Sequence, residues 1–304
     1  MTKRALPLFL LLAAPAWAAF QTDLSSARSA SLGNAAAATE SGAADLFESP
    51  GALARTGTSE ASFKYAKPFA GIDGADFGVG AFSLAVPTRW GVVGAGVASF
   101  QAPGSLQENT FSAAYGVSLL NDRLRAGAAL KRLDHKYLIG GDALAQNDPI
   151  FRNGTSRTAY DADVSLAASI GGPLEAGVTV RNLRRADVGL AGEDRLSREV
   201  QGGLSCNLPS LGLTASGDLF FGARAGGGSG AVRPALGLEK SFGGQTPFFL
   251  RAGANRDRFS TGLGLRWRRI SLDYAFLLPR ALSVSDGSTH QIQLTWRFSA
   301  AGGR

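Results

Sequence analysis

Strict alternation of apolar and polar residues is the feature that most limits what this chain can fold into. The last patterned stretch, HQIQLTWRF at residues 290–298, alternates throughout. Its apolar face carries Ile292, Leu294, Trp296 and Phe298, and its polar face carries Gln291, Gln293, Thr295 and Arg297. Successive side chains of a strand point to opposite faces, so this stretch predicts a strand with one wholly apolar face. A strand of a soluble sandwich shows the same pattern, and the stretch alone leaves the fold open.

The same period-two pattern recurs from about residue 58 onward. The clearest further examples are 123–131, 160–170, 174–181, 258–268 and 270–280. Weaker, glycine-rich stretches complete a series of fourteen, an even number. The predicted strands are 58–69, 74–87, 89–101, 106–119, 123–138, 156–170, 174–183, 197–207, 210–222, 231–242, 246–255, 258–268, 270–280 and 289–298. Strands of this length suit a tilted crossing of a lipid bilayer.

The predicted connections alternate in length. After even-numbered strands the turns are very short, as at 121–122 and 171–173. After odd-numbered strands they are mostly longer, as at 139–155 and 184–196, and the short link around 255–257 is an exception. Outer-membrane barrels combine short periplasmic turns with longer extracellular loops. A soluble sandwich has no reason to sort its loops in this way.

Charged residues lie in mid-strand on the faces opposite the apolar ones. Taken alone, this pattern also suits a soluble barrel with an apolar interior. Fourteen strands, however, enclose an interior too wide for side chains to fill. Closure would also satisfy every backbone group in lipid, which an open sheet could not do. We therefore predict an all-β fold: a transmembrane antiparallel β-barrel of about 14 strands at residues 58–298, followed by a C-terminal extension at 299–304.

Residues 1–18 have the features of a secretory signal peptide. A basic start, Met1-Thr-Lys-Arg4, precedes an apolar run at 5–18 that is short for a membrane-spanning helix. Ala16-Trp17-Ala18 supplies the small residues of a cleavage site. The alternative is a single transmembrane anchor. We expect export and a location in the cell outer membrane.

Composition narrows the remaining function classes. The net charge is +7, but the basic residues are spread along the chain rather than clustered, so we expect no nucleic-acid partner. The lone Cys206 excludes an intramolecular disulfide. His135 and His290, the only histidines, stand in no nucleophile–base motif, so we expect no enzyme. Two histidines and one cysteine also disfavour zinc, and we expect no metal and no cofactor.

Residues 19–57 do not alternate, and part of this region resembles a known family. The stretch SARSASLGNAAAATESGAADLFESPGALA at 26–54 is similar to the N-terminal region of the FadL/PorV superfamily of outer-membrane proteins. The resemblance is carried by Ala27-Arg28, Leu32-Gly33 and Ser49-Pro50-Gly51-Ala52-Leu53, with Ser49 in place of an asparagine. VRNL at 180–183 and LDYAF at 272–276 resemble recurrent elements of the PorV-like branch.

The resemblance implies a fourteen-stranded barrel with residues 19–57 as a plug or hatch inside it. The plug residues it implies are Gly33, Asn34, Ser49, Pro50 and Gly51. In FadL-like members the plug gates passive transport of hydrophobic or amphipathic small molecules, which leave sideways through the wall. In PorV-like members the barrel is a protein-interaction device for type IX secretion or envelope assembly. A hydrophobic ligand or secretion-system proteins are the corresponding partners, and both functions stay open.

Several arginines fall on the predicted inner faces. They are Arg123, Arg125, Arg181, Arg251, Arg266 and Arg297. One interpretation is an electropositive lumen that attracts carboxylate head groups. The interpretation we favour is a network in which they pair with Asp161, Asp163, Asp273 and the plug.

The apolar face of the last strand predicts two further partners. If it faces lipid, the partner is the outer-membrane bilayer. A terminal aromatic on an alternating final strand also resembles the signal that the barrel-assembly machinery recognises. Trp296 and Phe298 are the candidate residues for that signal.

Overall fold

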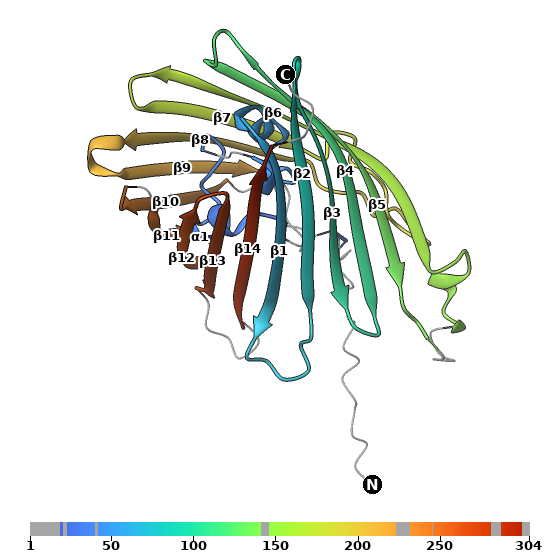
Figure 1. Cartoon of the computed structure of the whole chain (residues 1–304). Helices are drawn as coiled ribbons and strands as arrows, with labels where there is room; N and C mark the ends of the chain where they lie inside the picture. The colour runs from blue at the N-terminus through green and yellow to red at the C-terminus, as the bar shows by residue number, and fades with distance from the viewer. Residues whose placement is uncertain are drawn as a thin grey trace.

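The structure, a computed structural model, describes residues 19–20, 23–39, 42–140, 146–222, 232–244, 246–280 and 287–299. Within these residues, fourteen antiparallel strands close into one barrel, and β1 pairs with β14 (Figure 1). The strands are β1 (Ser59–Ala70), β2 (Gly78–Thr88), β3 (Gly91–Ala102), β4 (Leu106–Leu119), β5 (Leu124–Tyr137), β6 (Ser156–Gly171), β7 (Leu174–Arg181), β8 (Glu199–Leu208), β9 (Leu213–Phe221), β10 (Arg233–Phe242), β11 (Phe248–Asn255), β12 (Arg258–Trp267), β13 (Ile270–Pro279) and β14 (Ser288–Phe298). The predicted closed barrel of 14 strands is confirmed. The predicted signal peptide at 1–18 and residues 300–304 lie outside the described residues.

The strand boundaries differ from the predicted ones by at most four residues. β2 begins at Gly78 rather than 74, because Gly71 and Gly74 have positive φ angles and extend the preceding turn. β9 begins at Leu213 rather than 210, because the 3₁₀ turn η4 (Pro209–Leu211) ends in Gly212 with φ of 56°. Two further 3₁₀ turns, η1 (Ala43–Asp45) and η2 (Pro50–Arg55), belong to an N-terminal segment inside the barrel that is described below. A third, η3 (Pro149–Phe151), lies between β5 and β6.

The outer face of the barrel is apolar and the inner face polar, as the alternation predicts. In β14, Ile292, Leu294 and Trp296 are exposed, whereas Gln291 and Gln293 are buried. The other strands keep the same parity, with large exposed side chains such as Leu236, Leu263 and Tyr160 facing outward. Such a face is favourable against hydrocarbon and costly against water, so it fits a bilayer.

The two ends of the barrel differ. We call the end that joins β2 to β3, β4 to β5 and β12 to β13 the short-turn end, and the opposite one the long-loop end. Trp90, Trp267 and Trp296 are all exposed at the short-turn end. Tryptophan favours the boundary between lipid tails and water. This ring of aromatics is therefore suited to mark one membrane interface.

The seam between the first and last strands is held by side chains as well as by backbone. Ser59 to Ala66 pair with Phe298 to Gln291 in unbroken register. On the inner face, Ser62 Oγ lies 3.0 Å from Thr295 Oγ1, and Gln293 Nε2 donates to Ser62 Oγ at 2.9 Å. The first and last strands thus close the barrel through backbone and side chains together.

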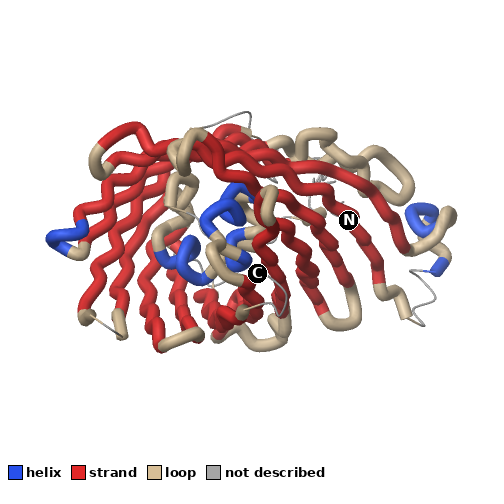
Figure 2. Tube along the Cα trace, turned by 45° about the horizontal axis from the view of Figure 1, so that its top comes forward, coloured by secondary structure: helices blue, strands red, loops and turns tan. Residues whose placement is uncertain are grey.

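The N-terminal residues 23–39 and 42–57, which we call the lumenal segment, lie inside the barrel (Figures 1 and 2). Its elements are α1 (Ala27–Ser31), η1 (Ala43–Asp45) and η2 (Pro50–Arg55). α1 contacts β11 to β14, and η2 contacts β3 to β6 on the other side of the lumen. In the described part of the chain, no helix has the length and apolar character needed to cross a membrane.

Glycines in the wall let the backbone of the lumenal segment lie directly on the strands. A Cβ added at Gly177 would lie 2.0 Å from the carbonyl oxygen of Ala37, and one at Gly253 would lie 2.1 Å from the carbonyl carbon of Leu32. Real side chains do not tolerate such approaches to backbone atoms. The wall and the segment are therefore fitted to each other at main-chain level.

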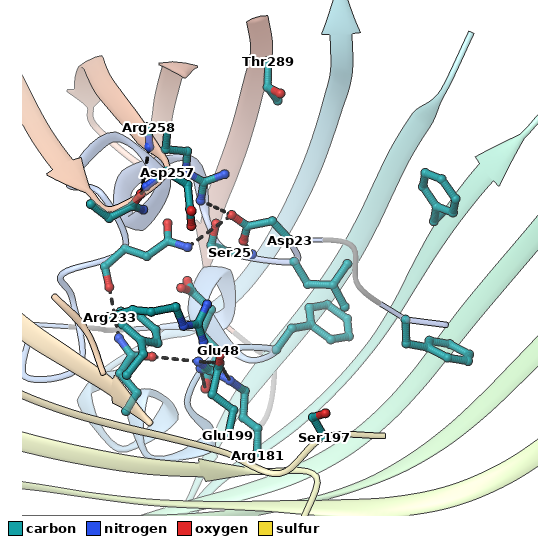
Figure 3. Close-up of a pocket in the computed structure, with 18 of the residues that line it drawn as sticks. Asp23, Ser25, Glu48, Arg181, Ser197, Glu199, Arg233, Asp257, Arg258 and Thr289 are labelled. Atoms are coloured by element: carbon teal, nitrogen blue, oxygen red, sulfur yellow. Dashed lines mark hydrogen bonds and ion pairs between the residues drawn. The ribbon is translucent and has the colours of Figure 1, made fainter. Parts of the chain in front are cut away.

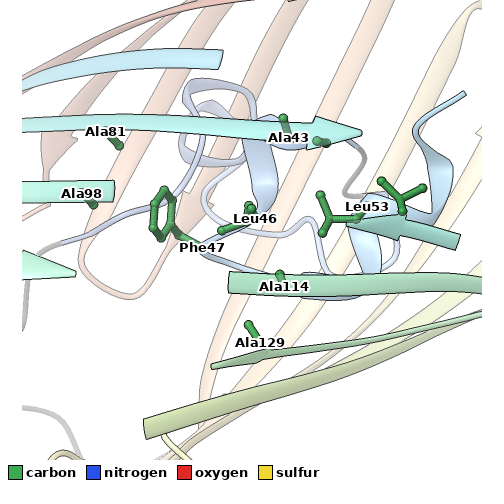
Figure 4. Close-up of a cluster of buried hydrophobic side chains, with 10 residues drawn as sticks. Ala43, Leu46, Phe47, Leu53, Ala81, Ala98, Ala114 and Ala129 are labelled. Carbon is green, nitrogen blue, oxygen red and sulfur yellow. The ribbon is translucent and has the colours of Figure 1, made fainter. Parts of the chain in front are cut away.

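One side of the lumenal segment packs as an apolar cluster against the wall. Leu46, Phe47 and Leu53 are nearly fully buried. They meet small inward residues of β2 to β5, of which Ala81, Ala98, Ala114 and Ala129 are labelled in Figure 4. Small wall residues leave room for large segment residues, which is how a wide lumen reaches dense packing.

Candidate functional site

In the described part of the barrel, one cavity lies on each side of the lumenal segment. We name the cavity of about 940 Å³ toward the long-loop end the upper cavity, although this end points down in Figure 1. The lower cavity, of about 810 Å³, lies toward the short-turn end. Residues close together in this segment line different cavities. Ser25 and Glu48 line the upper cavity, and Ser26 and Asp45 line the lower cavity. The described part of the segment therefore lies between the two cavities.

The upper cavity has an apolar side. Phe47 projects into it from the lumenal segment, beside Ala98 and Phe100 of β3. Nearby, Phe20 packs against a second buried cluster that includes Leu133 and Leu196. Volumes of a few hundred to a thousand Å³ with aromatic lining are typical of sites for small apolar molecules.

The opposite side of the upper cavity is polar, and several of its charges are paired (Figure 3). Glu199 accepts from Arg181 at 2.6 Å and also pairs with Arg233. Asp23 pairs with Arg258. Burial disfavours ionisation of Asp23, but the Arg258 guanidinium, the Ser25 hydroxyl and the charge of Lys64 together outweigh it and hold the pKa of that carboxyl well below its usual range. The cavity is therefore amphipathic, with charge that is largely neutralised.

The loop at 182–198 folds over the upper cavity and is held by strand β6. Backbone pairing of β6 with β7 begins only at Val164, so the preceding part of β6 has no strand on that side. Asp161 instead accepts the backbone N–H groups of Arg184 and Ala186, each at 2.9 Å. Val188 of this loop is buried. Asp161 thus fixes a loop, whereas the sequence suggested an arginine partner for it.

Carboxylates of the wall also fix the lumenal segment. Asp218 Oδ2 accepts the N–H groups of Ala36 and Ala37 at 3.0 and 2.9 Å. The same oxygen accepts from Gln201 Nε2 at 2.7 Å. Glu239 bonds Arg28 of the segment at 2.9 Å. Charged acceptors make strong hydrogen bonds, so these contacts anchor the segment.

The structure places five of the six predicted lumen arginines on the inner face. Arg251 contacts Glu239 at 2.6 Å and Asp273 at 2.7 Å, and Arg297 contacts Glu60 at 2.9 Å. Arg125 lies 3.6 Å from Glu175, and Arg181 contacts Glu199 as described above. Arg266 also lies on the inner face.

The prediction for Arg123 is wrong. The chain turns at Leu120–Asp122, where three successive residues have positive φ angles, and β5 begins only at Leu124. Arg123 is therefore exposed in the turn and not on the inner face.

The residues assigned to a plug lie at contacts between the lumenal segment and the wall. Gly33, with φ of 69°, approaches the backbone of Ala254, and the carbonyl of Asn34 accepts from Gln201 Nε2 at 3.0 Å. Ser49 and Pro50 begin η2, and Gly51 N–H donates to Ser165 Oγ at 2.6 Å.

The residues proposed for the assembly signal lie on the outer face of the barrel, and the two histidines lie on opposite faces of the wall. Trp296 and Phe298 face outward, with ring centroids 4.8 Å apart. His290 also faces outward and bonds Tyr274, whereas His135 lies inside beside Glu108. Among the described residues, no three His, Cys, Asp or Glu side chains are arranged to hold a metal ion.

Sequence reasoning missed several residues of the upper cavity. Glu199, Arg233 and Arg258 occupy inward positions of alternating strands, so strand parity could have identified them. Asp23 and Glu48 lie in the lumenal segment, where no periodic pattern gives a side chain its direction.

Glu48 is a buried acid whose ionisation opposes folding. Its carboxylate accepts Ser26 N–H at 2.9 Å and Ser29 Oγ at 2.7 Å. Burial first, and the charges of Asp45 and Asp23 second, raise the pKa of Glu48, and these effects outweigh the two hydrogen bonds. Lys64 and the Arg181 guanidinium, which bonds the Glu48 carbonyl, are the nearby cations. A raised pKa in the folded state contributes stability below the ordinary carboxyl range, and this is lost as the pH rises.

We therefore expect Glu48→Gln to flatten the pH dependence of stability. As the pH rises from about 5 to about 9, the melting temperature of the wild type should decrease, and that of the variant should decrease less. Thermal unfolding at both pH values measures this. Glu193→Gln, at an exposed loop position, is the control and should behave as wild type. An equal fall in wild type and Glu48→Gln would contradict the assignment.

Comparisons with known proteins agree with this architecture. No family model and no curated protein sequence matches the chain. Among solved structures, the toluene transporter TbuX of Ralstonia pickettii is similar, with a TM-score of 0.63 and 12% identity over 90% of this chain and 98% of that one. The toluene transporter TodX of Pseudomonas putida (TM-score 0.59, 10% identity) and a Pseudomonas aeruginosa FadL homologue (TM-score 0.57, 11% identity) are similar over the same shares of both chains. The fold of this chain is therefore that of the FadL-like β-barrels.

Proposed function

We propose that this protein is an outer-membrane channel for passive transport of small hydrophobic or amphipathic molecules. The observation that carries this proposal is the upper cavity, whose apolar side is formed by Phe47, Ala98 and Phe100 above the lumenal segment. The apolar outer face and the ring of exposed tryptophans support the location. The similar structures are named as a toluene transporter, a monoaromatic hydrocarbon channel and a FadL homologue, which supports the substrate class.

In this proposal the lumenal segment acts as the plug. It is anchored to opposite sides of the wall and separates the two cavities, so a bound molecule cannot pass directly from one cavity to the other. Export through the signal peptide at 1–18 and recognition of Trp296 and Phe298 by the barrel-assembly machinery belong to the same proposal. A role in secretion is less well supported, because the similar structures are named as transporters and channels. The same names give no support to an enzyme.

Filling the upper cavity tests the proposal. Ala98→Trp places an indole on the inner face beside Phe47, and we expect it to reduce toluene uptake by about tenfold or more, equivalent to about 1.4 kcal/mol of lost binding. The control is Ala95→Trp, three residues earlier on the outer face of the same strand. Uptake of labelled toluene by cells with equal amounts of folded barrel is the measurement. Equal uptake by the two variants, or no uptake by wild type, would refute the proposal.

A further inference from the structure

Ten charged residues line the lower cavity, and nearly all of them are paired. Arg28 and Arg251 share Glu239, Arg297 contacts Glu60, and Arg55 contacts Glu175. Among the described residues that line this cavity, Arg266 is the one guanidinium without a carboxylate in contact. The side chain of Arg266 is exposed to solvent. A guanidinium without a carboxylate in contact has N–H donors free for an incoming anion.

Arg266 is held in position by an aromatic ring. Its guanidinium carbon lies 5.5 Å from the centroid of Phe249, and that of Arg251 lies 5.3 Å from the same ring. Cation–π contacts of this kind orient a guanidinium while leaving its edge N–H groups free to donate. Arg251 is occupied by Glu239 and Asp273, so the free donors belong to Arg266.

A second arginine and a hydroxyl lie next to Arg266 on the inner face. Arg266 is directly opposite Ser271 in the β12–β13 pairing. Ser271 Oγ accepts from Arg297 Nη1 at 2.9 Å, and Arg297 directs its Nε to Glu60. The charge of Arg297 is therefore paired with Glu60, but among the described residues its second terminal nitrogen, Nη2, makes no hydrogen bond. Three adjacent strands therefore present donors to one part of the cavity.

We propose that this part of the lower cavity binds the carboxylate of a small organic acid through Arg266, with Arg297 as the second cation. A planar carboxylate matches the two-pronged edge of a guanidinium, whereas a single point charge does not. The site lies on the far side of the lumenal segment from the upper cavity, so it is separate from the proposed hydrocarbon site. It gives the barrel an affinity for organic acids at its short-turn end.

The test is a titration of 4-fluorobenzoate into the purified barrel in a nonionic detergent, followed by fluorine NMR. We expect saturable binding by wild type and a loss of about tenfold or more in Arg266→Gln. Arg266→Lys keeps the charge but loses the two-pronged edge of the guanidinium, so its affinity should lie between those of wild type and Arg266→Gln. The matched control is Arg268→Gln, two residues further on, where the guanidinium stacks on the outward-facing Trp267 ring.

Two outcomes would overturn the site. One is equal affinity of wild type and Arg266→Gln for 4-fluorobenzoate. The other is displacement of 4-fluorobenzoate by inorganic phosphate at equal concentration, which would show a general anion site without preference for carboxylates. Toluene uptake by Arg266→Gln should equal that of wild type, so failure of the acid site is distinguishable from failure of the transport proposal.

Discussion

Gly177→Val is expected to detach residues 36–38 of the lumenal segment from the wall. The new side chain would collide with the main chain of Ala37, and backbone cannot yield as a flexible side chain does. Overpacking of this kind costs about 1–3 kcal/mol or more. The expected results are a lower melting temperature and a higher, noisier conductance in planar bilayers, because the lumen is no longer filled.

The control for this variant lies on the adjacent strand. Gly202 pairs with Val178 on the outer face, and a Cβ there meets nothing within 4 Å. Gly202→Val should therefore keep the wild-type melting temperature and conductance. If Gly177→Val also behaves as wild type, the segment does not rest on this part of the wall.

Asp218→Leu is expected to release the same stretch by removing its acceptor rather than by collision. The substitution leaves the N–H groups of Ala36 and Ala37 and the amide of Gln201 without their partner. A buried unsatisfied donor costs about 1–3 kcal/mol, so the loss of all three is about 3 kcal/mol or more. Hydrogen exchange at the amides of Ala36 and Ala37 should accelerate by about a hundredfold or more.

Two variants make this result specific. Asp218→Asn keeps one acceptor oxygen and should lose less protection than Asp218→Leu. Asp76→Leu, at a well-exposed loop position, should leave exchange at Ala36 and Ala37 unchanged. Unchanged protection in Asp218→Leu would mean that the segment is held by its other contacts alone.

The wall was predictable from sequence because lipid imposes a rule on every second residue. In β12 and β14 most outward positions are apolar, so residues such as Leu263 and Leu294 reveal both the strand and its orientation. The rule stops where a strand leaves the membrane. In the sequence, Arg123 continues the alternation of β5, but in the structure the turn at Leu120–Asp122 takes it out of the strand.

The interior was less predictable because no periodic rule applies to it. Asp161 faces inward as expected, yet it bonds the backbone of a loop that sequence alone does not place nearby. The importance of Gly177 and Gly253 depends on which residues cross the lumen beside them. The direction of Glu48 depends on the fold of the lumenal segment. Such roles come from contacts between distant parts of the chain.

Gln293 connects three parts of the chain that are made at different times during synthesis. Its amide nitrogen bonds Ser62 of the first strand, and its oxygen accepts the N–H of Ala27 at 2.7 Å. The last strand to be synthesised therefore meets the first strand and the lumenal segment through one side chain. A barrel that closed before its interior was filled would leave this amide half satisfied. We expect closure of the wall and docking of the segment to be a single cooperative event in biogenesis, with the N-terminal residues serving as an internal template for the strand that completes the ring.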